Sequence, residues 1–296
     1  MKKKGKIPGR YHKTLKEQVR ENPRLAAVYV ILRVLVVLAL VAQVFNGNFE
    51  NVFLCVLTLI LFTIPSFIER TIRIDIPDTL EIIILLFIFA AEILGEIQAY
   101  YVQFPYWDTM LHTLNGFLCA AIGFSLLDIL NRDERLAFKL SPVYLAVVAF
   151  CFSMTIGVLW EFFECFMDQM LLLDMQKDTI VHSIGSVMLD PAGGNTPVAI
   201  HDITDVIVVT ADGAQHPLGL GGYLDVGILD TMKDLFVNFI GAVVFSFIGY
   251  FYVKSRGKGR FARRFIPQVV DIQPEDQEPW TPKLLKKSKK NRSDKE

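Results

Sequence analysis

Ionisable side chains at helical spacing, inside apolar stretches, are the residues of this sequence best suited to chemistry. Residues three or four positions apart share one face of a helix. An ionisable group in hydrocarbon is costly, so such a face indicates a functional site. The residues with this spacing are Glu92 and Glu96; Asp108, His112 and Asn115; Glu161, Glu164 and Asp168; and Asp230, Asp234 and Asn238.

A histidine among several carboxylates is a ligand set suited to Zn²⁺, Mn²⁺ or Fe²⁺, whereas oxygen ligands alone suit Ca²⁺ or Mg²⁺. We expect His112, Glu161 and Glu164 to be the metal ligands, with the two glutamates reaching the ion from one helix. Asp108 or Asp234 would then act as general base. The cofactor predicted on these grounds is a divalent metal ion, which could activate water or polarise an ester or phosphoryl oxygen.

Structural roles compete with this interpretation at every position. Without a metal, crowded carboxylates would share protons, and His112 with Glu161 would form an internal polar network. The remaining structural roles are a membrane-interface or core position for Trp160, helix caps for Asp108 and Asp230, solvation for Asp168, interhelical hydrogen bonds for Asn115 and Asn238, and a cap on a short outer helix for Asp178.

The elements that must carry these residues are membrane spans. The chain of 296 residues is 52% hydrophobic with a mean hydropathy of +0.40. A hydrocarbon core about 30 Å thick needs about 20 mainly apolar residues in a helix. The stretches that meet this requirement are 25–45, 51–67, 79–100, 109–129, 143–167 and 230–253. We therefore predict an all-α polytopic protein, a six-helix transmembrane bundle within residues 25–254.

Basic residues set the predicted orientation. Nine Lys and Arg residues precede Leu25, thirteen lie from Lys254 onward, and the second and fourth connections are also basic. By the positive-inside rule both ends are cytoplasmic, as a basic arm at 1–24 and a basic, disordered tail at 255–296. The ends either lie against anionic lipid headgroups or serve only as topology signals. This segregation of charge points to a lipid bilayer as partner rather than to nucleic acid.

With this topology, all four polar faces fall in the outer half of the membrane. Apart from Arg33, the inner half of the spans looks nearly free of charge. We therefore expect one outward-open cavity lined by spans three to six. The connection at 172–229 has β-branched residues at 207–210 and a turn signal at Asp212-Gly213, which predicts a small extracytoplasmic β-hairpin insertion.

Four blocks in order resemble the YjdF-like family of bacterial inner-membrane proteins: WDTMLHTLNGFLCAAIGF, GVLWEFFECFMD, DMQKDT and LDTMKDLFVNFIGA. The resemblance implies a multi-pass protein of the bacterial plasma membrane but implies no reaction. The family's characteristic polar positions fall on Asp108, His112, Trp160, Glu161, Glu164, Asp178, Asp230, Asp234 and Asn238. The chain departs from the family between Gly185 and Asp230. The first block is also faintly similar to VanZ-like membrane proteins, an analogy that points to the cell envelope.

Three functions remain open from the sequence. The first is an extracytoplasmic, metal-assisted enzyme acting on an envelope or lipid-linked substrate. The second is a proton- or metal-ion-coupled transporter, against which the apolar inner half counts. The third is a non-catalytic membrane scaffold, in which the polar network fixes the packing of the helices.

Overall fold

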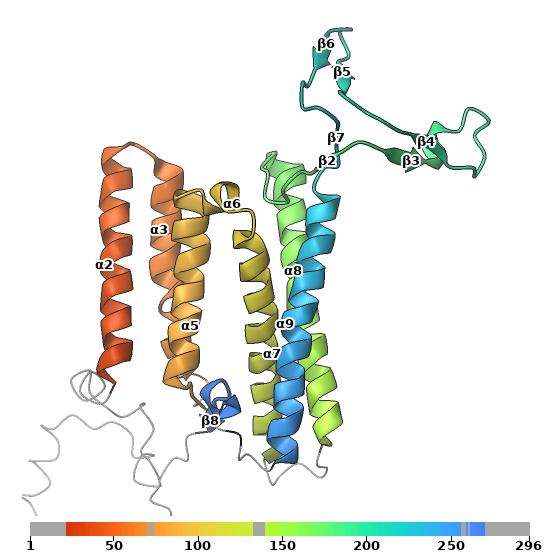
Figure 1. Ribbon diagram of the computed structural model, residues 1–296. Coiled ribbons are helices and arrows are strands. Elements are labelled where there is room, and N and C mark those ends of the chain that lie inside the picture. Colours follow the sequence, from red (N-terminus) through yellow and green to blue (C-terminus); the bar gives the residue numbers. More distant parts are fainter. Residues whose placement is uncertain are drawn as a thin grey trace, which may run out of the picture.

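The structure is a computed structural model that describes residues 22–69, 71, 74–132, 140–255, 259 and 261–269. Most of the basic arm and of the tail lies outside these residues, as do Arg70, Arg73, Arg135 and Lys139. The described chain is mostly helical, with short antiparallel strand pairs at both ends of the helices (Figure 1). The helices are α2 Pro23–Phe45, α3 Phe49–Leu61, α4 Ile64–Ile68, α5 Asp78–Phe89, α6 Tyr100–Gln103, α7 Trp107–Arg132, α8 Pro142–Leu171 and α9 Ile228–Lys254, with a π-helix η3 at Ala90–Ile97.

Five stretches are long and apolar enough to cross a membrane: α2, α3 with α4, α7, α8 and α9. Their starts follow familiar capping rules. Ser141 Oγ accepts a hydrogen bond from the Tyr144 amide at 3.2 Å, with Pro142 in the first turn of α8. Asn48 Oδ1 accepts from the Asn51 amide at 3.1 Å at the start of α3. Large apolar side chains such as Leu38 are exposed on the outer faces of these helices, as lipid contact requires.

The third predicted span differs from the others because its helix type changes part-way along. The α-helical α5 has 12 residues, and the chain continues as the eight-residue π-helix η3, which carries Glu92 and Glu96. Ala99 then adopts a left-handed conformation with a φ of 55° and ends the helical run before α6. Trp107 Nε1 donates to the Ala90 carbonyl at 3.3 Å, which ties η3 to the start of α7. π-Helical turns are rare and often occur beside functional sites.

The helices form two groups around two apolar cores, and α5 contributes to both, with Leu85 in the first core and Leu80 in the second. Buried residues of α2, α3, α5 and η3, among them Val36, Cys55 and Leu85, make one apolar cluster. The second core is built mainly by α7, α8 and α9, including Phe124 and Phe245. In this second group α7 and α9 touch backbone to backbone: a Cβ at Gly241 would collide with the Thr113 carbonyl, and one at Gly116 with the Asn238 carbonyl. Small residues allow such close approach between membrane helices.

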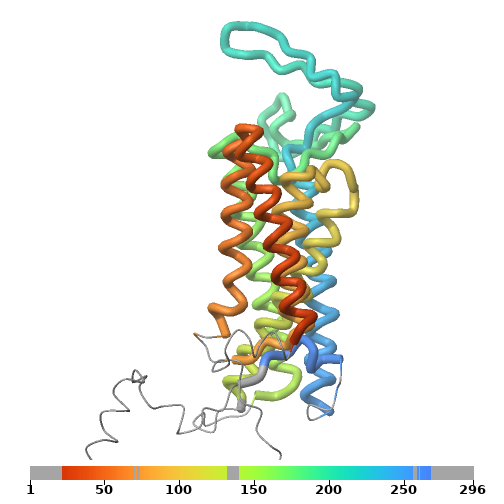
Figure 2. Tube along the Cα trace, turned by 90° about the vertical axis from the view of Figure 1, so that its left-hand side faces the viewer, coloured from red at the N-terminus to blue at the C-terminus, as the bar shows by residue number. Residues whose placement is uncertain are grey.

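The connection between α8 and α9 holds three antiparallel strand pairs. They are β2 Ile180–Val181 with β7 Tyr223–Leu224, β3 Ile184–Ser186 with β4 Val198–Ile200, and β5 Ile207–Val209 with β6 Gln215–Pro217; a 3₁₀ turn, η4 Val187–Leu189, follows β3. Figure 2 shows this segment extending beyond the helices at one end. At the opposite end β1 Ile74–Asp75 pairs with β8 Gln268–Val269.

Two expectations about the end that bears β8 are wrong for the described residues. The sequence predicts a disordered tail at 255–296, yet Phe265 and Ile266 are buried beside the 3₁₀ turn η5 Ala262–Arg264, and β8 is paired; residues 270–296 of the predicted tail lie outside the described residues. The sequence also predicts an inner half nearly free of charge, yet Glu81 is 2% exposed and Asp128 is 7% exposed. Both residues lie within one or two turns of a helix end. A hydropathy average over a whole span gives little weight to single charged residues at such positions.

Candidate metal centre

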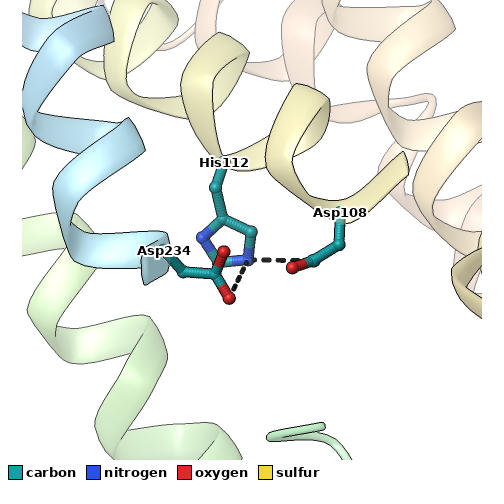
Figure 3. Close-up of side chains that lie close together, drawn as sticks. All are labelled: Asp108, His112 and Asp234. Atoms are coloured by element: carbon teal, nitrogen blue, oxygen red, sulfur yellow. Dashed lines mark ion pairs between the residues drawn. The ribbon is translucent and has the colours of Figure 1, made fainter. Parts of the chain in front are cut away.

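The centre of the site is the imidazole of His112, which lies between carboxylates of two helices (Figure 3). His112 Nε2 is 3.4 Å from Asp108 Oδ1, one turn earlier on α7, and 4.0 Å from Asp234 Oδ2 on α9. One ligand atom from each of these three residues lies within 4.8 Å of the other two. Side chains of α7 and α9 therefore converge on the imidazole of His112.

The helix α8 supplies the third side. Glu161 Oε1 lies 3.7 Å from His112 Nδ1, so both nitrogens of the ring face carboxylate oxygens. Glu164 is one turn further along α8, where its Oε1 accepts a hydrogen bond from Trp160 Nε1 at 2.7 Å. Glu161 is 4% and Glu164 8% exposed, so both carboxylates are buried.

Lys233 brings an ammonium group to this cluster. Its Nζ lies 2.5 Å from Asp230 Oδ1, 3.5 Å from Asp108 Oδ2 and 3.7 Å from Asp234 Oδ1. Around His112 and Lys233 stand the carboxylates of Asp108, Glu161, Glu164, Asp230 and Asp234. Five carboxyl groups therefore surround one imidazole and one ammonium group.

Within the described part of the chain, three buried oxygens of the cluster make no hydrogen bond: Asp108 Oδ2, Glu161 Oε2 and Asp234 Oδ1. Two of them, Asp108 Oδ2 and Asp234 Oδ1, face the Lys233 ammonium only as ion pairs of 3.5 and 3.7 Å, and Asp234 is only 1% exposed. A buried carboxylate oxygen without a partner is costly, and a cation is the partner that removes this cost most completely. The donor set is therefore chemically suited to a positive ion.

The spacing of the donors also fits an ion. Ligand atoms about 2.0–2.2 Å from a metal ion lie roughly 3–3.5 Å from one another in a tetrahedral site. The 3.4 Å separation of His112 and Asp108 already meets this spacing, and the 4.0 Å separation of His112 and Asp234 needs a shift of a side chain. One imidazole nitrogen with carboxylate oxygens is the ligand chemistry of Zn²⁺, Mn²⁺ and Fe²⁺.

A layer of amides closes the site toward the middle of the helices. Asn115 Nδ2 on α7 donates to Asn238 Oδ1 on α9 at 3.1 Å, and Asn238 Nδ2 contacts Met154 Sδ on α8 at 3.6 Å. Directly beside them, Ser153 Oγ donates to the Gly116 carbonyl at 2.8 Å. The two asparagines thus make the interhelical hydrogen bonds expected of a structural role, directly beside the charged cluster.

A strap at 174–179 lies at the other end of the site and is held by carboxylates. Asp168 accepts from the amides of Met175 and Gln176 at 2.7 and 2.8 Å. Asp230 accepts from the Lys177 amide at 2.8 Å, and Asp225 from the Thr179 amide at 2.7 Å. Asp168 and Asp230 are therefore bonded to backbone and not merely solvated.

One more hydrogen bond and the environment of Asp178 complete the description of the strap. Gln176 Nε2 donates to Thr231 Oγ1 at 2.5 Å, which joins the strap to the first turn of α9. Burial raises the pKa of Asp178, and the neighbouring carboxylates of Asp174, Asp225 and Asp168 raise it further. Asp178 thus belongs to the strap and not to the group around His112.

Glu92 and Glu96 lie apart from the centre. Within the described residues, no hydrogen bond or ion pair joins either of them to the His112 cluster. The ring of Tyr101 lies against Gly95, on the same helix as this pair. The four polar faces predicted from spacing thus form a centre on α7, α8 and α9 and an acidic pair on η3.

Sequence reasoning missed the strap, and it offered Lys233 only as a counter-charge, beside His112, to the carboxyl groups of the predicted cavity. Gln176 and Lys177 lie inside the block DMQKDT, so the block itself was the available signal. Lys233 directly precedes Asp234 and follows Asp230 at a spacing of three, which predicts an ion pair on the helix surface. Nothing in the sequence indicates that its ammonium would reach across to Asp108 on another helix.

A family model described as a predicted membrane protein family, DUF2238, matches residues 27–196, more than half of the chain. The chain belongs to this family. The expected membership of an uncharacterised membrane-protein family is thereby confirmed, under the DUF2238 description rather than the YjdF-like one. The DUF2238 match includes His112 and Glu161 and ends before α9. Neither the curated proteins nor the solved structures compared with the chain gave a match.

Proposed function

We propose that this DUF2238 protein binds a divalent metal ion at Asp108, His112 and Asp234, with Glu161 beside them. The observation that carries the proposal is the convergence of one histidine nitrogen and two carboxylates from α7 and α9 within 4.8 Å. The buried oxygens without hydrogen bonds support it. The sequence predicts Asp108 or Asp234 as general base and Glu164 as a ligand. In this proposal Asp108 and Asp234 are ligands instead, and Glu164 accepts a hydrogen bond from Trp160.

The ion would serve an extracytoplasmic reaction on an envelope or lipid-linked substrate. A bound metal supplies Lewis-acid chemistry toward an ester or phosphoryl oxygen and lowers the pKa of water. Glu161 is then the candidate general base, because its Oε1 faces His112 and its Oε2 makes no hydrogen bond within the described chain. Access is from the strap end, where the side chains of Asp108 and Lys233 are 20% and 43% exposed.

The proposal includes a topology: six spans in a bacterial plasma membrane, with both chain ends in the cytoplasm. This topology places the site on the extracytoplasmic side. Supporting this proposal, α5 and η3 run as one helical rod beside α3 (Figure 1). The basic residues of both chain ends favour the cytoplasm, where they can meet anionic lipid headgroups. Reporter fusions after residues 105 and 296 test this topology. A periplasmic reporter should be active only at 105, and activity at 296 would contradict the orientation.

Metal analysis of the purified protein tests the site directly. After chelation and reloading with Zn²⁺ or Mn²⁺, wild type should retain about one equivalent of metal, as one site with these ligands requires. His112→Ala and Asp234→Asn should each lose it. The matched control is Glu50→Gln, which removes an exposed carboxylate at the start of α3 and should retain the metal.

The contrast between these variants decides the proposal. Equal metal content in wild type and His112→Ala would show that the ion binds elsewhere or only adventitiously. Folding is checked by thermal unfolding in chelator, where every variant should still show a cooperative transition.

One observation favours transport as a second function. The buried Glu81 on α5 accepts a hydrogen bond from the Tyr29 hydroxyl at 2.7 Å, near the end of the helices that lies opposite the site. Buried carboxylates at both ends are what a coupled transporter requires, and an apolar inner half no longer counts against it. Metal-dependent uptake into proteoliposomes, abolished by both Asp234→Asn and Glu81→Gln, would establish transport. If wild-type protein shows no uptake, transport is excluded as the second function.

A further inference from the structure

We infer that Lys233 is a tethered competitor of the metal ion: its ammonium group and the ion bind the same two carboxylates, so that loading of the site requires Lys233 to withdraw. This inference rests on the proposed metal site and deepens it, because it assigns to one residue the control of how tightly the ion is held.

The competition follows from how Asp108 and Asp234 divide their oxygens. Asp108 presents Oδ1 to His112 Nε2 at 3.4 Å and Oδ2 to Lys233 Nζ at 3.5 Å. Asp234 does the same, with Oδ2 at 4.0 Å from the imidazole and Oδ1 at 3.7 Å from the ammonium. Each carboxylate that could bind the ion therefore already faces a cation on its other side.

An ion and the ammonium cannot both occupy this position at low cost. A dication bound by both carboxylates would stand within a few ångströms of a unit positive charge. Like charges at such distances repel strongly in a partly buried setting. In the absence of metal, the same ammonium compensates carboxylates that would otherwise be buried without any partner.

Lys233 is also built to move. Its side chain is 43% exposed, in contrast to the 1% of Asp234 beside it. A lysine carries its charge on a flexible four-carbon stem, which can turn outward to water without a change in the backbone. Asp230, at 2.5 Å from Nζ, is bonded to the strap through the Lys177 amide and offers the ammonium a partner further from His112.

The test is a Zn²⁺ and Mn²⁺ titration of full-length protein in detergent or nanodiscs, against a chromophoric chelator. Lys233→Met and Lys233→Gln should bind the metal at least about tenfold more tightly than wild type, which corresponds to about 1.4 kcal/mol. Lys233→Arg keeps the charge and should bind close to wild type. Lys254→Met is the matched control on the same helix, because Lys254 contacts Tyr250 and not the site.

The outcomes separate this inference from the proposal beneath it. If wild type binds metal through His112 but the two neutral variants bind with equal or weaker affinity, the competition is overturned and the metal site stands. If wild type binds no more metal than His112→Ala, the site itself fails, and the role of Lys233 falls with it. Tighter binding in both neutral variants but not in Lys233→Arg or Lys254→Met establishes the competition.

Discussion

The two helix groups of this protein are built from similar apolar sequence but differ in what they enclose. The group of α2, α3, α5 and η3 has a core of aliphatic and aromatic residues, with its carboxylate–tyrosine contact, Glu81 to Tyr29, near one end. The group of α7, α8 and α9 has an apolar core in one half and a charged centre in the other. The difference suggests that the first group anchors and the second carries the chemistry.

The two groups resemble each other on their lipid-exposed faces and differ in their buried polar side chains. Exposed faces are apolar in both groups because both meet lipid, so composition alone does not separate them. Polar side chains inside a span are expensive and remain where they have partners or a function. Buried Glu81 and Thr58 lie in the first group, whereas Asp234, Glu161 and Asn238 gather in the second, so the second group holds the larger cluster of buried polar side chains.

The largest expected effect comes from separating α7 and α9. Gly241→Leu would drive a side chain into the Thr113 carbonyl, so we expect loss of the folded state, beyond the roughly 1–3 kcal/mol of ordinary overpacking. Yield and thermal unfolding after purification measure this. The control is Gly185→Ala, which meets no atom within 4 Å and should behave like wild type. A stable Gly241→Leu protein would contradict the tight contact.

The next largest effect is expected from comparing a variant of the second group, Asp234→Asn, with a variant of the first group, Leu85→Ala. Asp234→Asn should weaken metal binding by at least about a hundredfold, since even residues that support ligands change affinity by about 10–100-fold. Leu85→Ala in the apolar core should cost about 2 kcal/mol or more of stability and leave metal affinity unchanged. Metal titration and unfolding are measured on both variants. Loss of metal binding in Leu85→Ala would show that the groups are not independent.

A smaller effect is expected at the polar contact of the first group. Tyr29→Phe removes the hydrogen bond to Glu81 and should lower the free energy of unfolding by about 1.5–3 kcal/mol, as for bonds to charged groups. Denaturant or thermal unfolding measures the change. Metal affinity should stay that of wild type, and a fall in both quantities would link the two ends of the molecule.

The smallest effect concerns the strap. Asp168→Asn weakens the acceptor for the amides of Met175 and Gln176, so these amides should exchange with deuterium faster while global stability changes by less than about 1.5 kcal/mol. Hydrogen-exchange mass spectrometry resolves the peptide that contains them. Unchanged exchange at 174–179 would show that Asp168 does not hold the strap.

Much of the architecture was open to prediction because hydropathy and spacing are local signals. The apolar runs predicted the long helices within a few residues, and the spacing of Asp230, Asp234 and Asn238 anticipated the buried face of α9. The division of the third expected span into α5 and η3 was not predictable in this way, since a π-helix depends on packing against its neighbours.

What could not be predicted depends on contacts between distant parts of the chain. The pairing of β1 with β8 joins residues almost two hundred positions apart. The meeting of Asp108 with Asp234 requires the relative height of α7 and α9, which Gly116 and Gly241 set. The buried Glu81 lies near a helix start, where a carboxylate looks like an ordinary N-terminal residue, and only the neighbouring Tyr29 on α2 shows otherwise.

The backbone contact between α7 and α9 decides which part of the proposed metal centre can change. Because Gly116 and Gly241 bring the two backbones into direct contact, α7 and α9 resist sliding past each other, and the backbone positions that carry His112 and Asp234 stay fixed while their side chains can shift. The outer turns of α8 are less constrained, since the Ser153 bond to α7 lies two turns below Glu161. A change of state at this centre would therefore alter the number of carboxylates that face the imidazole, with Glu161 joining or leaving a fixed pair.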